Sequence, residues 1–346
     1  MGHAEEGTQA LDQSFLETTI YHNRLFQNYA INNLAYLVPI DEEEEERLHI
    51  MHNVFSMIFE QRLIFAPINR PRRVLDLGHG TGSWALEVAE LHSRCEVIGI
   101  DICPTMQPRE MPANLYLQVD DVNRTFSFNA HHFDLVQSRM MTGAVHTNRW
   151  AQYMRDMLRV TRPGGWCQMI ELYYNFQSDN GTLTPDHALS QWSARYLESM
   201  AGLKDLRQAT RLPNLMRDAG FVDVESRMIP LPTCGWGTEQ RDNEIGATNR
   251  ENIQRMLNSL AIFPFTERLN MPIQDVHLLI AQARVEADNP AFKVMQSPAP
   301  DDEAASEGRA GRVFSVALSL AFQVHALNFQ RKSNGELSCH PMSPSD

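Results

Sequence analysis

"VLDLGHGTGSWAL", residues 74–86, joins an apolar run to a glycine-rich turn and then to the start of a helical pattern. Glycines stand at alternate positions, Gly78, Gly80 and Gly82, where a backbone without Cβ atoms turns sharply and lets a ligand approach. The stretch therefore predicts a strand, a ligand-binding turn and a helix in immediate succession. Because "GTGSWA" also satisfies the GxGxxG/A dinucleotide fingerprint, the glycines alone leave the ligand open.

The chain beyond this stretch repeats the alternation of strand and helix. Its apolar segments are short and nearly continuous, which is typical of strands buried on both faces of a parallel sheet. We predict a Rossmann-like α/β fold with a seven-stranded, mostly parallel sheet, N-terminal helices and a helical cap. The expected strands are residues 73–78, 96–101, 115–121, 133–139, 165–174 and 222–231, with a final edge strand within 321–332.

Polar residues at the ends of the next two strands suit a nucleoside. Asp101 ends the second strand, nineteen residues beyond Gly82, where a carboxylate can accept hydrogen bonds from both ribose hydroxyls. Ile102 can pack on an adenine face. The group Asp120, Asp121 and Val122 ends the third strand, where it can read the edge of the base.

Asp76 separates the two candidate cofactors. A carboxylate two residues before the turn attracts an ammonium group and repels a pyrophosphate. This favours S-adenosylmethionine (SAM) over NAD. Arg139, at the end of the fourth strand, is placed to meet the methionine carboxylate, with a buried ion pair as the rival interpretation.

Four features in order strengthen this interpretation: Asp-x-Gly-x-Gly-x-Gly from Asp76, an acidic second-strand end, "FDLV" at 133–136 and "RPGG" at 162–165. Together they resemble the class I SAM-dependent methyltransferases. "YLVPIDEEEEERLHIMHNVF", "GIDICPTMQP" and "RPGGWCQMIELYYNFQSDNGTL" further resemble the fungal LaeA-like methyltransferases. That resemblance covers roughly residues 20–290. It implies a SAM-binding enzyme of secondary metabolism or a regulator of it that works with velvet-type proteins.

The resemblance and the composition divide the chain into five parts. We expect an N-terminal helical segment (1–65), a SAM-binding core (66–175), a helical cap with one returning strand (176–295), a linker or insertion (296–320) and a final strand with a tail (321–346). The cap helices are expected to roof the ligand pocket.

The acidic run at residues 39–59 is interpreted as a helix rather than as a binding tail. Asp41 is a good N-cap, and Glu44 occupies the capping-box position. The other glutamates lie where the helix dipole favours anions. We expect a solvated helix start that leads into an apolar packing face.

Methyl transfer is an in-line displacement for which a general base is optional, so catalytic residues are hard to identify from a sequence. His146, Glu171 and Tyr173 are the candidates because they lie at or beyond the carboxyl ends of the fourth and fifth strands. Each has a structural alternative: His146 as a hydrogen-bonding loop residue, Glu171 as a support near the methionine end, and Tyr173 as packing beneath the cap.

Composition narrows the function further. A formal net charge of −13 argues against direct nucleic-acid binding, and the five scattered cysteines indicate neither disulfides nor a metal site. No apolar run reaches the length of a membrane span, and the N-terminus lacks secretory features, so a cytoplasmic or nuclear location is expected. We expect a methyltransferase that acts on a small hydroxyl- or amine-bearing natural product. The alternative is a velvet-associated regulatory subunit with a protein partner.

Overall fold

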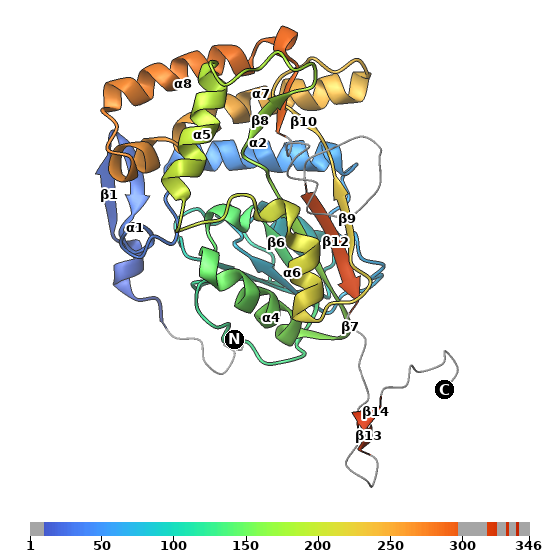
Figure 1. The fold of residues 1–346 in the computed structure, drawn as a ribbon. Helices are drawn as coiled ribbons and strands as arrows, with labels where there is room; N and C mark the ends of the chain where they lie inside the picture. Colours follow the sequence, from blue (N-terminus) through green and yellow to red (C-terminus); the bar gives the residue numbers. More distant parts are fainter. Residues whose placement is uncertain (1–9, 297–316, 324–329, 332–336, 339–346) are drawn as a thin grey trace.

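The structure, a computed structural model, describes residues 10–296, 317–323, 330–331 and 337–338. Its centre is a seven-stranded sheet with the strand order β5-β4-β3-β6-β7-β12-β9, in which β5, β4, β3, β6 and β7 run parallel (Figure 1). This confirms the predicted class and strand number. The strands are β3 (Arg73–Leu77), β4 (Glu96–Asp101), β5 (Leu115–Val119), β6 (Phe133–Arg139), β7 (Thr161–Glu171), β9 (Glu225–Met228) and β12 (Ala317–Gln323).

The far side of the sheet differs from the prediction in one respect. The final strand, β12, is not at the edge: it lies between β7 and β9 and is antiparallel to both. The edge strand is β9. It is shorter than the expected strand 222–231, since only Glu225–Met228 pairs with β12. The predicted insertion at 296–320 falls mainly on residues outside the described part of the chain.

Helices cover both faces of the sheet. On one face lies α3 (Ser83–Leu91), whose Trp84 and Val88 are buried against the strands. On the other lie α4 (Trp150–Val160) and α6 (Leu212–Ala219); the latter ends at Gly220, whose φ of +107° suits a glycine C-cap. Since both faces are covered, the nearly continuous apolar strands are explained.

The N-terminal segment forms a hairpin, β1 (Thr18–Tyr21) and β2 (Arg24–Gln27), followed by α1 (Asn28–Asn32) and α2 (Glu42–Ile58). The Asp41 side chain accepts a hydrogen bond from the Glu44 backbone N–H, as the capping pattern predicts. The Glu44 side chain does not complete a capping box in solvent. It is fully buried and bonded to the Arg47 guanidinium at 2.6 Å and 2.8 Å, because α7 packs over this face of α2.

The cap contains α5 (Ala188–Met200), α7 (Gln240–Ser259) and α8 (Ile273–Ala287), which share one apolar cluster with α2. Figure 1 shows these helices at the opposite end of the molecule from the α4 and α6 layer. A small antiparallel sheet of β8 (Phe176–Ser178), β10 (Leu231–Pro232) and β11 (Val294–Gln296) joins the cap to the core. Short elements are η1 (Gln13–Leu16), η2 (Met141–Gly143), η3 (Thr147–Arg149), η4 (Gln208–Thr210), η5 (Pro264–Arg268), η6 (Pro290–Phe292), β13 (Gln330–Arg331) and β14 (Leu337–Ser338).

Two further observations concern the residues that the structure describes. None of their helices combines the length and the apolar character needed to cross a bilayer. Their four cysteines, Cys95, Cys103, Cys167 and Cys234, are buried and unpaired.

Candidate cofactor and acceptor site

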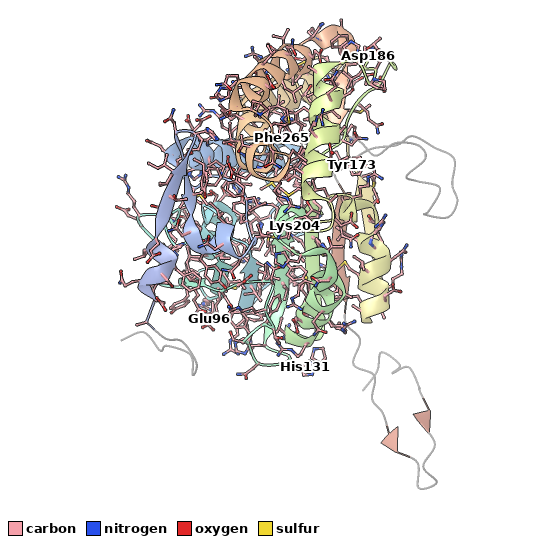
Figure 2. The ribbon with its side chains drawn as sticks, turned by 60° about the vertical axis from the view of Figure 1, so that its left-hand side comes forward. Glu96, His131, Tyr173, Asp186, Lys204 and Phe265 are labelled. Carbon is pink, nitrogen blue, oxygen red and sulfur yellow. The ribbon has the colours of Figure 1, made fainter. Side chains whose placement is uncertain are left out.

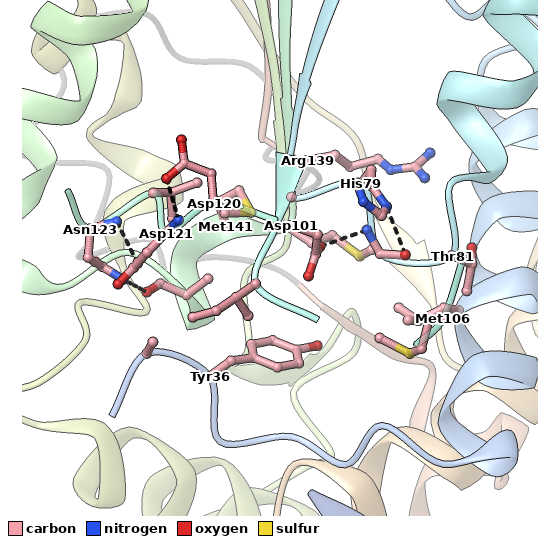
Figure 3. A pocket seen from close by; sticks show the side chains of 18 residues that line it. Tyr36, His79, Thr81, Asp101, Met106, Asp120, Asp121, Asn123, Arg139 and Met141 are labelled. Atoms are coloured by element: carbon pink, nitrogen blue, oxygen red, sulfur yellow. Dashed lines mark hydrogen bonds between the residues drawn. The ribbon is translucent and has the colours of Figure 1, made fainter. Parts of the chain in front are cut away.

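A pocket opens at the carboxyl edge of the parallel strands, where β3, β4, β5 and β6 end (Figure 3). This is the edge at which open α/β sheets bind their ligands. We call the wall formed by the strand ends the motif wall. It consists of Gly78, His79, Gly80, Thr81, Asp101, Ile102, Asp120, Asp121, Val122, Asn123, Arg139, Met140 and Met141.

The glycine turn is built around the Asp101 carboxylate. The Gly80 backbone N–H donates to Asp101 Oδ2 at 2.8 Å, and the Cys103 N–H donates to Asp101 Oδ1 at 2.9 Å. Both carboxylate oxygens are therefore oriented by the backbone, and each keeps further acceptor capacity. The Asp101 oxygens are therefore placed to accept hydrogen bonds from a vicinal diol.

The three motif glycines have different tasks. All have positive φ, at +73°, +57° and +75° for Gly78, Gly80 and Gly82. A Cβ on Gly78 would lie 2.3 Å from the Met141 sulfur, and one on Gly82 would lie 2.9 Å from the Pro108 ring, so these two permit close packing. A Cβ on Gly80 would meet only a Leu48 methyl at 3.8 Å. Gly80 is thus the position at which the backbone stays open to the pocket.

At the end of β5, the two adjacent aspartates are held differently. Asp121 accepts from the Tyr29 hydroxyl at 3.3 Å and from the Asn123 side-chain amide at 3.1 Å. Asp120 Oδ1 accepts the Asp121 backbone N–H at 2.8 Å, and burial raises the pKa of Asp120. Asp121 therefore fixes the loop, and both aspartates line the pocket.

Arg139 is oriented at the other end of the motif wall. Its guanidinium lies over the Phe55 ring and donates to His52 Nδ1 at 3.2 Å. Because arginine has no acceptor, His52 must carry its proton on Nε2, which then donates to Glu87 at 3.0 Å. Burial lowers the pKa of Arg139, and the Asp76 carboxyl opposes that effect. The side chain remains a cation that lines the pocket.

Eight of the residues predicted to bind cofactor line this pocket, and two do not. Gly82 packs behind the turn as the N-cap of α3. Asp76 is 3% exposed within β3, and burial raises its pKa to about 7. Asp76 lies behind the pocket lining beside Arg139, and its role toward the ammonium group of SAM stays a prediction. The eight residues found in the wall are Gly78, Gly80, Asp101, Ile102, Asp120, Asp121, Val122 and Arg139.

The three predicted catalytic side chains lie outside the pocket lining. His146 Nε2 bonds to the Leu34 carbonyl at 3.0 Å, and Tyr173 is 2% exposed. Glu171 is fully buried and accepts the backbone N–H groups of Met141 and Thr142 at 2.9 Å and 3.0 Å. Burial raises the pKa of Glu171 to about 7. These contacts agree with the structural roles considered above, His146 as a hydrogen-bonding loop residue and Glu171 as a support. A catalytic role for any of the three residues stays a prediction.

Sequence reasoning missed the second wall of the pocket. We call residues 34–41 the strap; it contributes Ala35 and Tyr36, while Leu48 of α2 continues the same wall. Figure 3 shows Tyr36 approaching from the side opposite Asp120 and Arg139. The cap helices α5, α7 and α8 contribute no residue to the lining of this pocket, so the roof expected from them stays a prediction.

The strap is tied down through its backbone carbonyls. Lys204 Nζ donates to the Ala35 carbonyl at 3.0 Å and to the Ala144 carbonyl at 2.5 Å, and His146 bonds the neighbouring Leu34 carbonyl. Lys204 is 3% exposed, and burial lowers its pKa to about 7. No sequence pattern marks Lys204, which follows α5 and lies more than 160 residues beyond the strap. The available signal for the strap was the run "YLVPID", which directly precedes a capped helix.

Comparisons with known proteins agree with this geometry. A family model described as a methyltransferase domain matches residues 50–226. Methyltransferase pytC of Aspergillus terreus is 30% identical over 77% of this chain and 81% of its own length. The secondary metabolism regulator laeA of Gibberella zeae is 28% identical over 80% and 88%, respectively.

A third relative, the protein-methionine methyltransferase laeA of Emericella nidulans, is 28% identical over 73% of this chain and 68% of its own. The resemblance predicted from the strand-end motifs is thus confirmed. The sheet order, the glycine turn at the carboxyl edge and the matched family lead to one conclusion: this chain belongs to the methyltransferase domain family.

Proposed function

We propose that this chain transfers the methyl group of SAM to a hydroxyl or an amine of a small secondary metabolite. The observation that carries the proposal is the Asp101 carboxylate, which Gly80 and Cys103 orient at the edge of an open glycine turn. The relative named methyltransferase pytC, from Aspergillus terreus, supports methyl transfer.

The residues present fit SAM. Gly80 leaves the backbone open, so a ribose and a methionine chain can lie against it. Asp101 would hold the ribose hydroxyls, Asp120 the adenine amino group, and Arg139 the methionine carboxylate. This arrangement places acceptors opposite donors and a cation opposite an anion.

SAM supplies an electrophilic methyl group on a sulfonium. What the protein adds is position and exclusion of water. Met140 and Met141 of the motif wall and Leu48 of the opposite wall present apolar surface, so an acceptor held there loses water before it reacts. Tyr36 borders the same space, and burial raises the pKa of its hydroxyl well above the ordinary value. That hydroxyl stays protonated, so it is available to donate a hydrogen bond to an acceptor oxygen.

A second candidate function is methyl transfer to a protein, or regulation through a protein partner. Two relatives carry the names secondary metabolism regulator and protein-methionine methyltransferase. None of the three candidate bases lines the pocket, and a thioether acceptor needs no base because its sulfur carries no proton. Such a protein is expected in the nucleus or cytoplasm.

The first experiment asks which ligand the pocket takes. Thermal unfolding of the full chain is followed with SAM, S-adenosylhomocysteine and NAD at equal concentrations, since a ligand of the native state raises the midpoint. SAM and S-adenosylhomocysteine are expected to raise it, and NAD is not. A shift with NAD alone would overturn the cofactor assignment.

The second experiment identifies the class of acceptor. The protein is incubated with deuteromethyl SAM and a fungal extract that has been split into small-molecule and protein fractions. Mass spectrometry should find the label in the small-molecule fraction. Label found solely in protein would favour the second candidate, and the Gly80→Arg variant provides the background for both.

A further inference from the structure

We propose that the amino edge of the sheet, opposite the cofactor pocket, is a docking surface for an acidic peptide segment of a partner protein. A single hollow at this edge is lined by five arginines, Arg70, Arg72, Arg73, Arg94 and Arg162. All five are exposed. The formal net charge of the chain is −13, so this hollow concentrates positive charge on a protein that is negatively charged overall.

The topology explains why these residues meet. Parallel strands share their amino ends, so the segments that lead into β3, β4, β6 and β7 converge at one edge. Figure 2 shows Glu96 and His131, which also line the hollow, at the end of the molecule away from the cap residues Asp186 and Phe265. Cofactor binding and peptide docking would therefore use opposite edges.

The frame beneath the arginines is held by hydrogen bonds. The Glu96 N–H donates to the Arg72 carbonyl at 2.8 Å, and the His131 N–H donates to the Arg159 carbonyl at 2.8 Å. Buried Asp134 accepts the backbone N–H groups of Arg72 and Arg73. A surface fixed in this way loses little conformational entropy when a ligand binds.

The carboxylates present do not neutralise the surface. Asp134 pairs with Arg162 at 2.6 Å, and Glu96 pairs with Arg73 at 3.0 Å. Within the described part of the chain, no ion pair is found for the other three guanidinium groups, those of Arg70, Arg72 and Arg94. Guanidinium groups bind carboxylates through paired N–H donors, so three of them facing one hollow match a short run of Asp or Glu.

A peptide fits better than a nucleic acid for two reasons. The acidic remainder of the chain repels a long polyanion that extends beyond the hollow, but it tolerates a few carboxylates placed inside it. Leu91 stands at the rim with 70% of its surface exposed and offers an apolar contact that a phosphate backbone does not use. An acidic segment with interspersed apolar residues satisfies both features.

The test uses the full chain and a fluorescein-labelled octapeptide of six glutamates and two leucines, followed by anisotropy at low salt. A peptide with glutamines in place of glutamates is the control ligand. The Arg70→Gln/Arg72→Gln/Arg94→Gln variant should weaken binding by about tenfold or more, since three charge-assisted contacts are lost. The matched control, Arg155→Gln/Arg195→Gln/Arg217→Gln, removes the same charge from exposed helix positions and should change the affinity by less than about twofold.

Several outcomes would overturn the proposal. Equal weakening by both triple variants would mean that net charge alone drives binding, and equal binding of the glutamine peptide would exclude charge recognition. A single-stranded oligonucleotide that displaces the peptide at lower concentration would assign the surface to nucleic acid. Self-association lost in the first variant would assign the surface to a second copy of this chain.

The folding control is the thermal shift that SAM induces. An unchanged shift in the first variant shows that its fold and cofactor site are intact.

Discussion

The two walls of the pocket are built in different ways. The motif wall comes from consecutive strand ends and turns, and its central contact joins Gly80 to Asp101 across 21 residues. The second wall comes from the strap and from Leu48 of α2. It depends on Lys204, which lies 169 residues along the chain from Ala35, whose carbonyl it bonds. The first wall is a local property of the βα units. The second exists only after the N-terminal segment has docked on the folded core.

The largest expected effect is loss of the motif wall through Gly80→Arg. The side chain would project into the pocket from a residue with a φ of +57°, which also disfavours any residue with a Cβ. We expect SAM affinity to fall by more than about a hundredfold, or about 2.7 kcal/mol, in titration calorimetry. Gly181→Arg is the matched control, since Gly181 has a φ of +70° and open space around it. Unchanged SAM affinity in Gly80→Arg would refute the site.

The next effect is expected for Asp101→Asn. An amide offers one acceptor oxygen, so the N–H groups of Gly80 and Cys103 can no longer both be satisfied by the side chain. SAM affinity should fall by about ten- to a hundredfold, which corresponds to losing one or two charge-assisted hydrogen bonds. Asp186→Asn, in an exposed loop of the cap, is the control for the same chemical change. Affinity within twofold of the parent in Asp101→Asn would show that this carboxylate does not hold the ligand.

A third prediction concerns Asp76, which lies behind the motif wall. Burial raises its folded-state pKa from 3.8 to about 7, so the folded protein retains a proton that the unfolded chain has released. This contribution to stability falls as the pH rises from about 4 to about 7 and stays constant above that. Asp76→Asn removes it, so the variant should gain about 2–3 kcal/mol relative to the parent between pH 5 and pH 8.

Urea unfolding of the parent and of Asp76→Asn at the two pH values measures this difference. Two other buried groups also make the stability depend on pH. Glu171, whose pKa is raised, lowers the stability as the pH rises, whereas Lys204, whose pKa is lowered, increases it between about pH 7 and 10.5. Both contributions are present in the parent and in the variant, so the difference between the two proteins reports Asp76. The exposed Asp218→Asn is the matched control. The prediction would be contradicted if the difference in unfolding free energy between Asp76→Asn and the parent were the same at pH 5 and pH 8.

The smallest effect is expected at the strap. Lys204→Met keeps the buried stem but leaves the carbonyls of Ala35 and Ala144 without their shared donor. The free energy of unfolding should fall by about 1 kcal/mol, and SAM affinity should fall by about three- to tenfold because Tyr36 is less well placed. Lys293→Met, at the residue between η6 and β11, is the control. Equal effects of the two variants on SAM affinity would mean that the strap is not part of the site.

The fold was largely predictable because its signals are local. Short apolar segments with turns between them predicted the five parallel strands, β3, β4, β5, β6 and β7. The N-cap residue Asp41 predicted the start of α2. The edge strand was misplaced because pairing between β12 and β9 depends on segments about ninety residues apart. Glu44 was expected in solvent, and its burial follows from the packing of α7, which helix periodicity cannot reveal.

By itself the sequence determined the motif wall. Glycine spacing, a carboxylate at the end of each of two strands and an arginine at the end of a third specify a ligand site, because parallel strands bring their carboxyl ends to one edge. Tertiary structure alone decided the rest: that Asp76 lies buried behind the motif wall, that the strap closes the pocket and that Lys204 holds it. Alternation along a strand and spacing in a turn act over a few residues, whereas docking depends on side chains that meet only in the folded chain.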